Sequence, residues 1–189
     1  DYYIDYLNNF TQLTPETRIL EVGCGEGGNL LPFAELGCKV TGVDRSPTRI
    51  WQAKEFFSQA GQVSNFITSD FFNLDTTAHK HCYDVILIHD VIEHIEEKET
   101  FVKHLKFFLA DDGIIFWGFP AWQMPFGGHQ QICHHKICSK LPFIHLLPNI
   151  LYQALLKSFG ESKGCIDELM EIKRCGVTTE KFEKLMNRN

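Results

Sequence analysis

The chain has 189 residues, of which 44% are hydrophobic and 22% are charged, and its formal net charge is −6. These values fit a single globular domain with a sizeable core, and they exclude a disordered chain or a collagen-like repeat. The acidic balance also lacks the basic excess that nucleic-acid binding or an anionic membrane would require.

Seven cysteines are spread along the chain, an odd number without a paired spacing. In a chain of ordinary length this pattern is typical of reduced thiols in a cytosolic protein. The first residues are acidic and do not resemble a signal peptide. The most apolar stretch, residues 141–159, is interrupted by two prolines, a histidine and a lysine, so it is too broken to span a bilayer. We therefore expect a cytoplasmic protein without stable membrane insertion.

Apolar residues recur at helical spacing over residues 2–10, which predicts a first helix. The run Arg18–Val22 is rich in aliphatic residues and predicts the first strand. A glycine-rich turn follows at Gly23–Gly28 and leads into a predicted helix over residues 29–36. Residues 39–43 form the predicted second strand.

Ser46 and Pro47 are a capping residue and a proline at the first helical position, so a helix is predicted to run to about residue 60. The alternation continues with strands over residues 65–68 and 83–88, a helix over residues 96–109, a turn at residues 111–113 and a strand over residues 114–119. The strand at 83–88 is apolar on both faces, as a buried parallel strand should be. Alternating strands and helices predict an α/β fold with a mostly parallel sheet.

The pattern changes after Pro120. Residues 120–140 predict a long functional loop, and residues 141–187 predict helices, the last of which begins at the capping signal of Thr178. No linker separates these parts, so we expect one domain over residues 1–189. Within it, residues 1–119 would form a ligand-binding core, and residues 120–189 would form a loop and helical cover.

The turn at Gly23–Gly28 predicts a ligand site. Glycines let a backbone turn tightly and approach a ligand, and the start of the next helix suits a carboxylate or a phosphate. Asp44 ends the second predicted strand, where an acidic side chain can accept hydrogen bonds from both hydroxyls of a ribose. The spacing of Gly23, Gly25 and Gly28 also matches the dinucleotide fingerprint G-x-G-x-x-G, so a nicotinamide dinucleotide remains an alternative.

Glu21 lies two residues before the first glycine, which completes the pattern E-x-G-x-G-x-G. This pattern resembles motif I of the class I S-adenosylmethionine-dependent methyltransferases, in particular the small-molecule enzymes of the type 11 and type 12 groups. The resemblance extends over residues 18–119 through Gly42-Val43-Asp44, Ser69-Asp70-Phe71, the stretch from Asp90 to Ile95, and Asp112-Gly113.

The resemblance implies a Rossmann-like, doubly wound sheet and S-adenosylmethionine as cofactor, with S-adenosylhomocysteine as product. It implies that Glu21 acts near the amino group of the methionine part, that Asp44 holds the ribose, and that Asp70 meets the adenine. The full set of cofactor residues expected from it is Glu21, Gly23, Cys24, Gly25, Asn29, Asp44, Arg45, Ser46, Asp70, Phe71 and His89. These folds usually finish with an antiparallel hairpin, for which this chain has no strand-like run.

A methyltransferase must position its acceptor, exclude water and, for an oxygen acceptor, remove a proton. Histidine is the usual base near neutral pH. We rank His129 first, because its loop follows the fifth strand, and His89 second, because it ends the fourth strand. A structural role is about equally plausible for His129 and more so for His89. Trp122 and Phe126 are expected to contact the acceptor together with His129.

The segment Cys133–Cys138 contains two cysteines and two histidines and could suggest a metal site. Neighbouring histidine side chains diverge, however, and the sequence shows no second pair of ligands, so we expect no metal. His94 and Glu93 are interpreted as an anchor for the helix that follows them.

The favoured function is methyl transfer from S-adenosylmethionine to a small acceptor, for which an apolar molecule is one option, and oxygen is the preferred site of attack. The alternatives are an NAD(P)-dependent oxidoreductase and a non-catalytic module that only binds S-adenosylmethionine. Nucleic acid is not expected as a partner, because the net charge is unfavourable. The sequence does not identify the acceptor or the oligomeric state.

Overall fold

The computed structural model describes residues 2–189, with Tyr2 described by its backbone alone, so Asp1 lies outside the described residues. The chain forms two compact units. The first contains residues up to His89 together with Thr100–Gly118, and the second contains Asp90–Glu99 and Phe119–Asn189. The expectation of one domain divided near residue 119 remains a prediction, and the sequence did not indicate that residues 90–99 group with the second unit.

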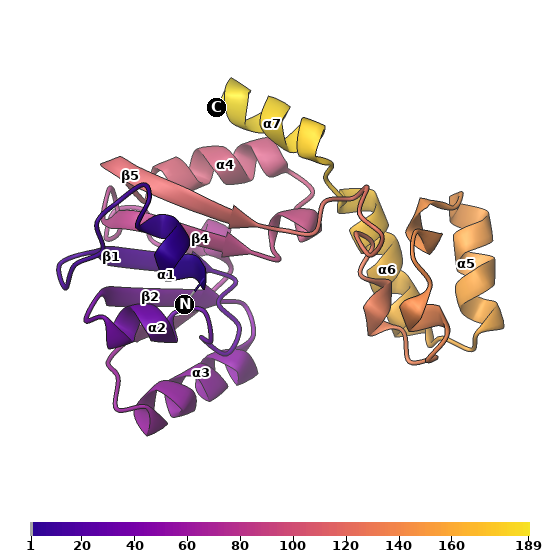
Figure 1. The fold of residues 1–189 in the computed structure, drawn as a ribbon, viewed down its shortest axis with the longest axis horizontal. Coiled ribbons are helices and arrows are strands. Elements are labelled where there is room, and N and C mark those ends of the chain that lie inside the picture. Colours follow the sequence, from indigo (N-terminus) through magenta and orange to yellow (C-terminus); the bar gives the residue numbers. More distant parts are fainter. Residues whose placement is uncertain (1) are drawn as a thin grey trace. The chain divides into compact units, whose positions relative to one another are not determined.

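The first unit is built on a sheet of five strands, all of whose pairings are parallel (Figure 1). The strands are β1 (Arg18–Val22), β2 (Lys39–Asp44), β3 (Asn65–Thr68), β4 (Tyr83–His89) and β5 (Leu109–Gly118). Their order across the sheet is β3-β2-β1-β4-β5. Both the predicted α/β class and the doubly wound, Rossmann-like topology are confirmed, because the order reverses beside β1.

The centre of this sheet is apolar on both faces. Val85 and Ile86 in β4 are fully buried, and so are Ile19 and Leu20 in β1. A central parallel strand is covered on both faces of the sheet. A strand with polar side chains at every second position would therefore bury those side chains without hydrogen-bond partners. The core therefore holds the carboxyl ends of β1, β2 and β4 at one edge, where a ligand site is expected in such sheets.

Three helices of the first unit form where the sequence predicted them, although their first or last residues differ from the prediction. They are α1 (Tyr2–Leu7), α2 (Leu31–Glu35) and α3 (Pro47–Gln59). The Ser46 side chain caps α3 by accepting a hydrogen bond from the backbone of Arg49 at 3.3 Å, as predicted. The prediction for α2 was wrong in length, because the glycine turn continues to Leu30 and leaves only five helical residues.

The boundary between α4 (Lys98–Lys106) and β5 was also predicted wrongly. The helix stops at Lys106, because the carbonyl oxygens of Phe107 and Phe108 accept hydrogen bonds from His81 and Tyr83. The predicted turn at residues 111–113 lies inside β5. Tyr83 pairs with Leu109 and Val85 pairs with Ile114, so the extra residues of β5 are accommodated in an irregularity of the edge strand.

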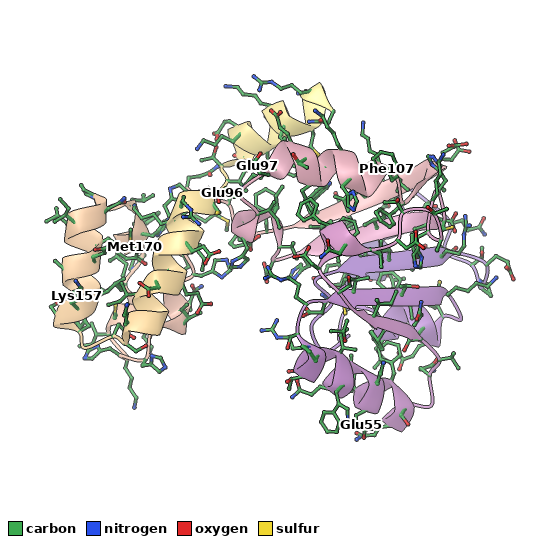
Figure 2. The ribbon with its side chains drawn as sticks, turned by 180° about the vertical axis from the view of Figure 1, so that it is seen from behind. Glu55, Glu96, Glu97, Phe107, Lys157 and Met170 are labelled. Atoms are coloured by element: carbon green, nitrogen blue, oxygen red, sulfur yellow. The ribbon has the colours of Figure 1, made fainter. Side chains whose placement is uncertain are left out.

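The second unit is helical. Its α-helices are α5 (Asn149–Ser158), α6 (Lys163–Cys175) and α7 (Thr179–Arg188), and Figure 2 marks Lys157 on α5 and Met170 on α6. The short 3-10 turns of the chain are η1 (Phe71–Asn73), η2 (Ile92–His94), η3 (Gln130–Ile132), η4 (Cys138–Lys140) and η5 (Ile144–Leu146). The predicted cap at Thr178 is confirmed, since its hydroxyl accepts a hydrogen bond from Lys181 N at 3.2 Å. Among residues 2–189, no helix has the length and apolarity needed to cross a membrane.

Candidate functional site

The glycine turn of the first unit is fixed to the neighbouring strand. The backbone N–H groups of Gly23 and Cys24 both donate to the carbonyl oxygen of Val43, at 2.8 and 3.1 Å. Gly23 and Gly25 have φ values of 73° and 53°, in the left-handed region that favours glycine. These two residues give the turn its tight path after β1.

The glycines of the turn have different surroundings. A Cβ atom at Gly27 would meet the ring of Phe66 at 2.9 Å, so this glycine is required by packing. A Cβ at Gly28 would meet nothing within 4 Å, and one at Gly25 only the end of Arg49 at 3.9 Å. The dinucleotide fingerprint needs its third glycine for close packing of helix against strand. Because Gly28 has no such contact, this geometry disfavours the nicotinamide alternative.

Asp44 connects the turn to the start of α3. One of its carboxylate oxygens accepts a hydrogen bond from Gly25 N at 3.0 Å, and the other accepts one from Ser46 N at 2.8 Å. Each oxygen of a carboxylate can accept a second hydrogen bond. Asp44 therefore holds two backbone segments in place and keeps acceptor capacity for a ribose.

Glu21 lies near the carboxyl end of the central strand β1, and its carboxyl group is buried. Its side-chain Oε1 accepts a hydrogen bond from the Asn29 amide at 2.8 Å, whereas its Oε2 has no partner among the described residues. The residue is 1% exposed, and burial raises the pKa of Glu21 to about 8. A buried carboxyl oxygen without a hydrogen-bond partner costs stability unless a donor or a cation joins it.

The Cys24 side chain lies in the apolar core rather than at the surface of the turn. It is 5% exposed and belongs to the apolar core of the first unit, and a Cβ at Gly42 would lie 2.7 Å from its sulfur. Burial raises the pKa of the Cys24 thiol, so the start of the short helix α2 does not activate it. Only its backbone remains available to a cofactor.

Asp70 and Arg45 lie next to each other beside the ends of β2 and β3. The Asp70 carboxylate caps η1 by accepting a hydrogen bond from Phe72 N at 3.0 Å, and its other oxygen lies 3.6 Å from Arg45 Nε. The Phe71 ring is 5% exposed and packs against Phe101 and Phe108. Any contact of Phe71 with a nucleoside must therefore use its backbone.

His89 lies at the last position of β4. A Cβ at Gly118 would be 2.5 Å from His89 Cδ2, so the absence of a side chain on the neighbouring strand makes room for the ring. The Tyr3 ring meets the His89 ring edge-on, with 5.8 Å between the centroids. His89 and His129 belong to different units of the chain.

The second unit brings His129 next to Glu93, and sequence reasoning missed this pair. His129 Nε2 lies 3.3 Å from Glu93 Oε1, and the Glu93 side chain is 1% exposed. Neither oxygen of Glu93 nor the Nε2 atom of His129 has a hydrogen bond of good geometry among residues 2–189, so the 3.3 Å contact is an ion-pair contact rather than an aligned hydrogen bond. Glu93 raises the pKa of His129 through this contact. The His94 ring lies 5.7 Å from the ring of His129, so His94 is part of the same cluster.

The loop that carries His129 is closely packed rather than open. A Cβ at Gly127 would lie 2.3 Å from Ala121 O, and one at Gly128 would lie 2.2 Å from the His145 side chain. Gln130 is fully buried and donates to the carbonyl oxygens of Pro125 and Leu141 at 2.7 and 3.1 Å. These contacts hold His129 in a left-handed conformation with φ of 54°.

Trp122 and Phe126 have different roles in this unit. The Trp122 ring packs edge-on against His145, with 4.6 Å between centroids, and Lys173 Nζ lies 5.4 Å from its centroid. A Cβ at Gly176 would be 2.3 Å from the Trp122 ring. Trp122 thus supports the loop, and its predicted contact with the acceptor is not needed to explain its position. Phe126 is half-buried and keeps its predicted role as a hypothesis.

Comparison with known proteins gives a consistent picture. A family profile described as "Methyltransferase domain" matches residues 20–115. A ubiquinone biosynthesis O-methyltransferase of Actinobacillus pleuropneumoniae serotype 7 (strain AP76) is 26% identical over 116 residues, covering 60% of this chain and 50% of that protein. A (S)-tetrahydroprotoberberine N-methyltransferase of Eschscholzia californica is 32% identical over 111 residues, covering 56% of this chain and 30% of that protein.

Among solved structures, the plantazolicin methyltransferase BpumL, in complex with a triazolic desmethylPZN analog and SAH, has a similar fold. Its TM-score is 0.66 at 21% identity, and the match covers 98% of this chain and 59% of that chain. The chain spans about half the length of the ubiquinone-pathway relative it matches.

Proposed function

The chain belongs to the methyltransferase-domain family, and we propose that it transfers a methyl group from S-adenosylmethionine to an oxygen atom of a small, apolar acceptor. The observation that supports this most is the environment of Glu21. Its buried Oε2 atom has no partner within the described chain, and the ammonium group of an amino-acid ligand would satisfy it.

The residues around the glycine turn fit the proposed cofactor. Gly25 leaves its surroundings open, since a Cβ there would meet only one side-chain atom at 3.9 Å. Asp44 has acceptor capacity for ribose hydroxyls, and Asp70 offers a carboxylate at the end of β3. Glu21, Gly25, Asp44 and Asp70 would therefore hold the methionine tail, the ribose and the adenine. S-adenosylmethionine supplies a methyl group on a positively charged sulfur, so no metal is needed to activate it.

We assign the general base to His129. A carboxylate at Glu93 can only accept hydrogen bonds, so it favours the tautomer in which His129 Nε2 carries the proton. The Nδ1 atom then keeps the lone pair that takes the proton from an acceptor hydroxyl. Glu93 also stabilises the charged imidazolium that results, which is the role of the acid in a catalytic His–Asp pair. His89 is the second candidate.

The names of the relatives support the proposed chemistry to different degrees. Relatives described as ubiquinone biosynthesis O-methyltransferases favour an oxygen acceptor. The (S)-tetrahydroprotoberberine N-methyltransferase makes an amine the second candidate. A non-catalytic module that only binds S-adenosylmethionine is the third candidate. The Glu93–His129 pair lies outside the residues proposed to hold the cofactor, and this favours a catalytic role.

We also propose that the enzyme works in the cytoplasm. All seven cysteines are free thiols in the structure, which suits a reducing compartment.

Calorimetric titration of the chain with S-adenosylhomocysteine and with NAD tests the cofactor. We expect binding of S-adenosylhomocysteine and no response to NAD, and the reverse result would overturn the proposal. A panel of phenols, catechols and amines, incubated with S-adenosylmethionine and followed by mass spectrometry, tests the acceptor. Methylation of amines alone would replace oxygen by nitrogen in the proposed function.

A further inference from the structure

A group of thiols lies in the core of the second unit and is not used by the proposed reaction. It consists of Cys133, Cys138 and Cys165 together with the carboxyl group of Glu161, here named the thiol cluster. All four residues are at most 8% exposed. Cys133 and Cys138 come from the segment after His129, Glu161 lies just before α6 and Cys165 lies in its first turn, so the cluster joins segments that are distant in the sequence.

Three members of the thiol cluster, Cys133, Cys138 and Glu161, lie close enough together to share one small cation, and Cys165 adjoins them through Glu161. The sulfur atoms of Cys133 and Cys138 lie 3.6 Å apart. A ligand oxygen of Glu161 and these two sulfurs all lie within 4.8 Å of one another, and Glu161 is within the same distance of the Cys165 sulfur. Two thiolates on a tetrahedral zinc ion, at Zn–S distances of about 2.3 Å, are separated by roughly 3.8 Å.

The carboxyl group of Glu161 is fixed before any ion binds. Its two oxygens accept hydrogen bonds from the backbone N–H groups of His134 and His135, at 3.0 and 2.9 Å. The Nδ1 atom of His134 lies 3.2 Å from one of them. Such outer hydrogen bonds orient a metal-binding carboxylate, because they restrict its rotation and leave lone pairs for the metal.

A second observation points independently to a missing hydrogen-bond acceptor. Tyr152 is fully buried, and its hydroxyl group has no hydrogen-bond partner among the described residues. The Tyr152 side chain belongs to the same small core as all three cysteines. A neutral thiol is a poor acceptor, whereas a metal-bound thiolate accepts strongly. A metal ion in the thiol cluster would therefore give this hydroxyl an acceptor.

We propose that the thiol cluster binds one Zn²⁺ ion through Cys133, Cys138, Cys165 and Glu161. Each of the three thiols loses its proton to solvent when its sulfur bonds to zinc, and no electron is transferred. Four protein ligands leave no open position on a tetrahedral ion, so the site is structural rather than catalytic. It would tie the loop that follows His129 to the start of α6. The sequence favoured no metal because it shows no second ligand pair beside Cys133–Cys138, whereas the structure brings in Glu161 and Cys165 from a distant part of the chain.

Metal analysis of the purified chain tests this. The chain is purified with a reducing agent, loaded with zinc and freed of excess, and its metal content is measured. We expect about one zinc per chain, and Co²⁺ in its place should show the thiolate-to-metal charge-transfer absorption of a tetrahedral site. Removal of zinc by a chelator should lower the midpoint of thermal unfolding by several degrees.

The double variant Cys133→Ser and Cys138→Ser should lose the zinc and the cobalt absorption. Cys175→Ser is the matched control, because Cys175 is also buried in this unit but lies outside the cluster; it should keep both. A wild-type chain that remains metal-free with reduced thiols would refute the proposal. So would a Cys133–Cys138 disulfide as the stable form. These measurements need no methyltransferase activity, so they do not depend on the proposed function.

Discussion

The Nε2 atom of His129 lies 3.3 Å from the Oε1 atom of Glu93, a carboxyl group whose side chain is 1% exposed. A buried acid beside a half-buried histidine sets the tautomer of the ring and raises its pKa. The two residues are far apart in the sequence, and the contact exists because the stretch after β4 and the loop after β5 belong to the same unit.

Glu93→Gln tests this contact. A base must be neutral, so activity should rise with pH through the pKa of His129. Without the carboxylate that pKa falls, and the acid limb of the kcat/KM profile should move to lower pH. We also expect kcat to fall ~10-fold or more, because a general base that has lost its supporting carboxylate loses part of its contribution to the rate. Glu97→Gln, at an exposed neighbouring position (Figure 2), is the control. An unmoved acid limb would show that His129 is not the titrating base.

Asp44→Ala tests the bracing of the glycine turn. The substitution removes the acceptor of the Gly25 and Ser46 N–H groups. Because a hydrogen bond to a charged group contributes about 1.5–3 kcal/mol, we expect S-adenosylhomocysteine to bind roughly 10- to 100-fold more weakly. Calorimetry measures this, with Asp112→Asn as an exposed control in the same unit. Equal affinities for the wild type and Asp44→Ala would remove Asp44 from the cofactor site.

Glu21 predicts a pH dependence of cofactor binding. Burial raises the pKa of Glu21 to about 8, so the free protein carries a protonated Glu21 below that pH. The ammonium group of the ligand favours the carboxylate, so binding releases a proton. Affinity for S-adenosylhomocysteine should therefore rise as the pH increases toward about 8, by at most ~10-fold per pH unit.

Glu21→Gln should abolish this pH dependence, because a glutamine has no proton to release. Glu26→Gln changes an exposed residue of the same turn and should preserve it. Titrations in buffers of different ionisation enthalpy count the released protons directly. A pH dependence that persists in Glu21→Gln would assign it to another group.

Gly118→Ala tests whether the His89 ring needs a position without a side chain on the neighbouring strand β5. The new Cβ would lie 2.5 Å from His89 Cδ2, so the ring or the strand must move. Overpacking of this kind costs about 1–3 kcal/mol, and urea unfolding should show a loss of this size. Gly164→Ala is the control, because a Cβ there meets nothing within 4 Å and alanine favours the helix α6. Equal stability of Gly118→Ala and the wild type would contradict the described packing.

The sequence predicted the sheet well, for a local physical reason. The bounds of β1 at Arg18–Val22 and β3 at Asn65–Thr68 agree with the prediction. Short apolar runs between turn residues strongly favour strands, because they are too short for a helix. The cap at Ser46 is equally local, since it depends on a hydroxyl and an N–H group three residues later.

Features that depend on distant pairing were not predictable. The start of β5 at Leu109 depends on its pairing with Tyr83, and no periodicity in the chain shows that an Asp-Asp-Gly sequence lies within a strand. The Glu93–His129 contact is of the same kind. The only local signal was an acidic residue directly after a buried strand, which in the sequence favoured a role as an anchor.

The interleaved chain path has a consequence for synthesis of the protein on the ribosome. The first unit is complete once Gly118 has emerged, but residues 90–99 have by then been made without the rest of their own unit. Ile92 and Glu93, both fully buried in the finished fold, belong to η2, and the contact of η2 with α6 cannot form until α6 has been translated. A nascent chain halted shortly after Gly118 should therefore bind chaperones through this segment. A protein truncated at that point would carry the sheet and an exposed, aggregation-prone loop at residues 90–99.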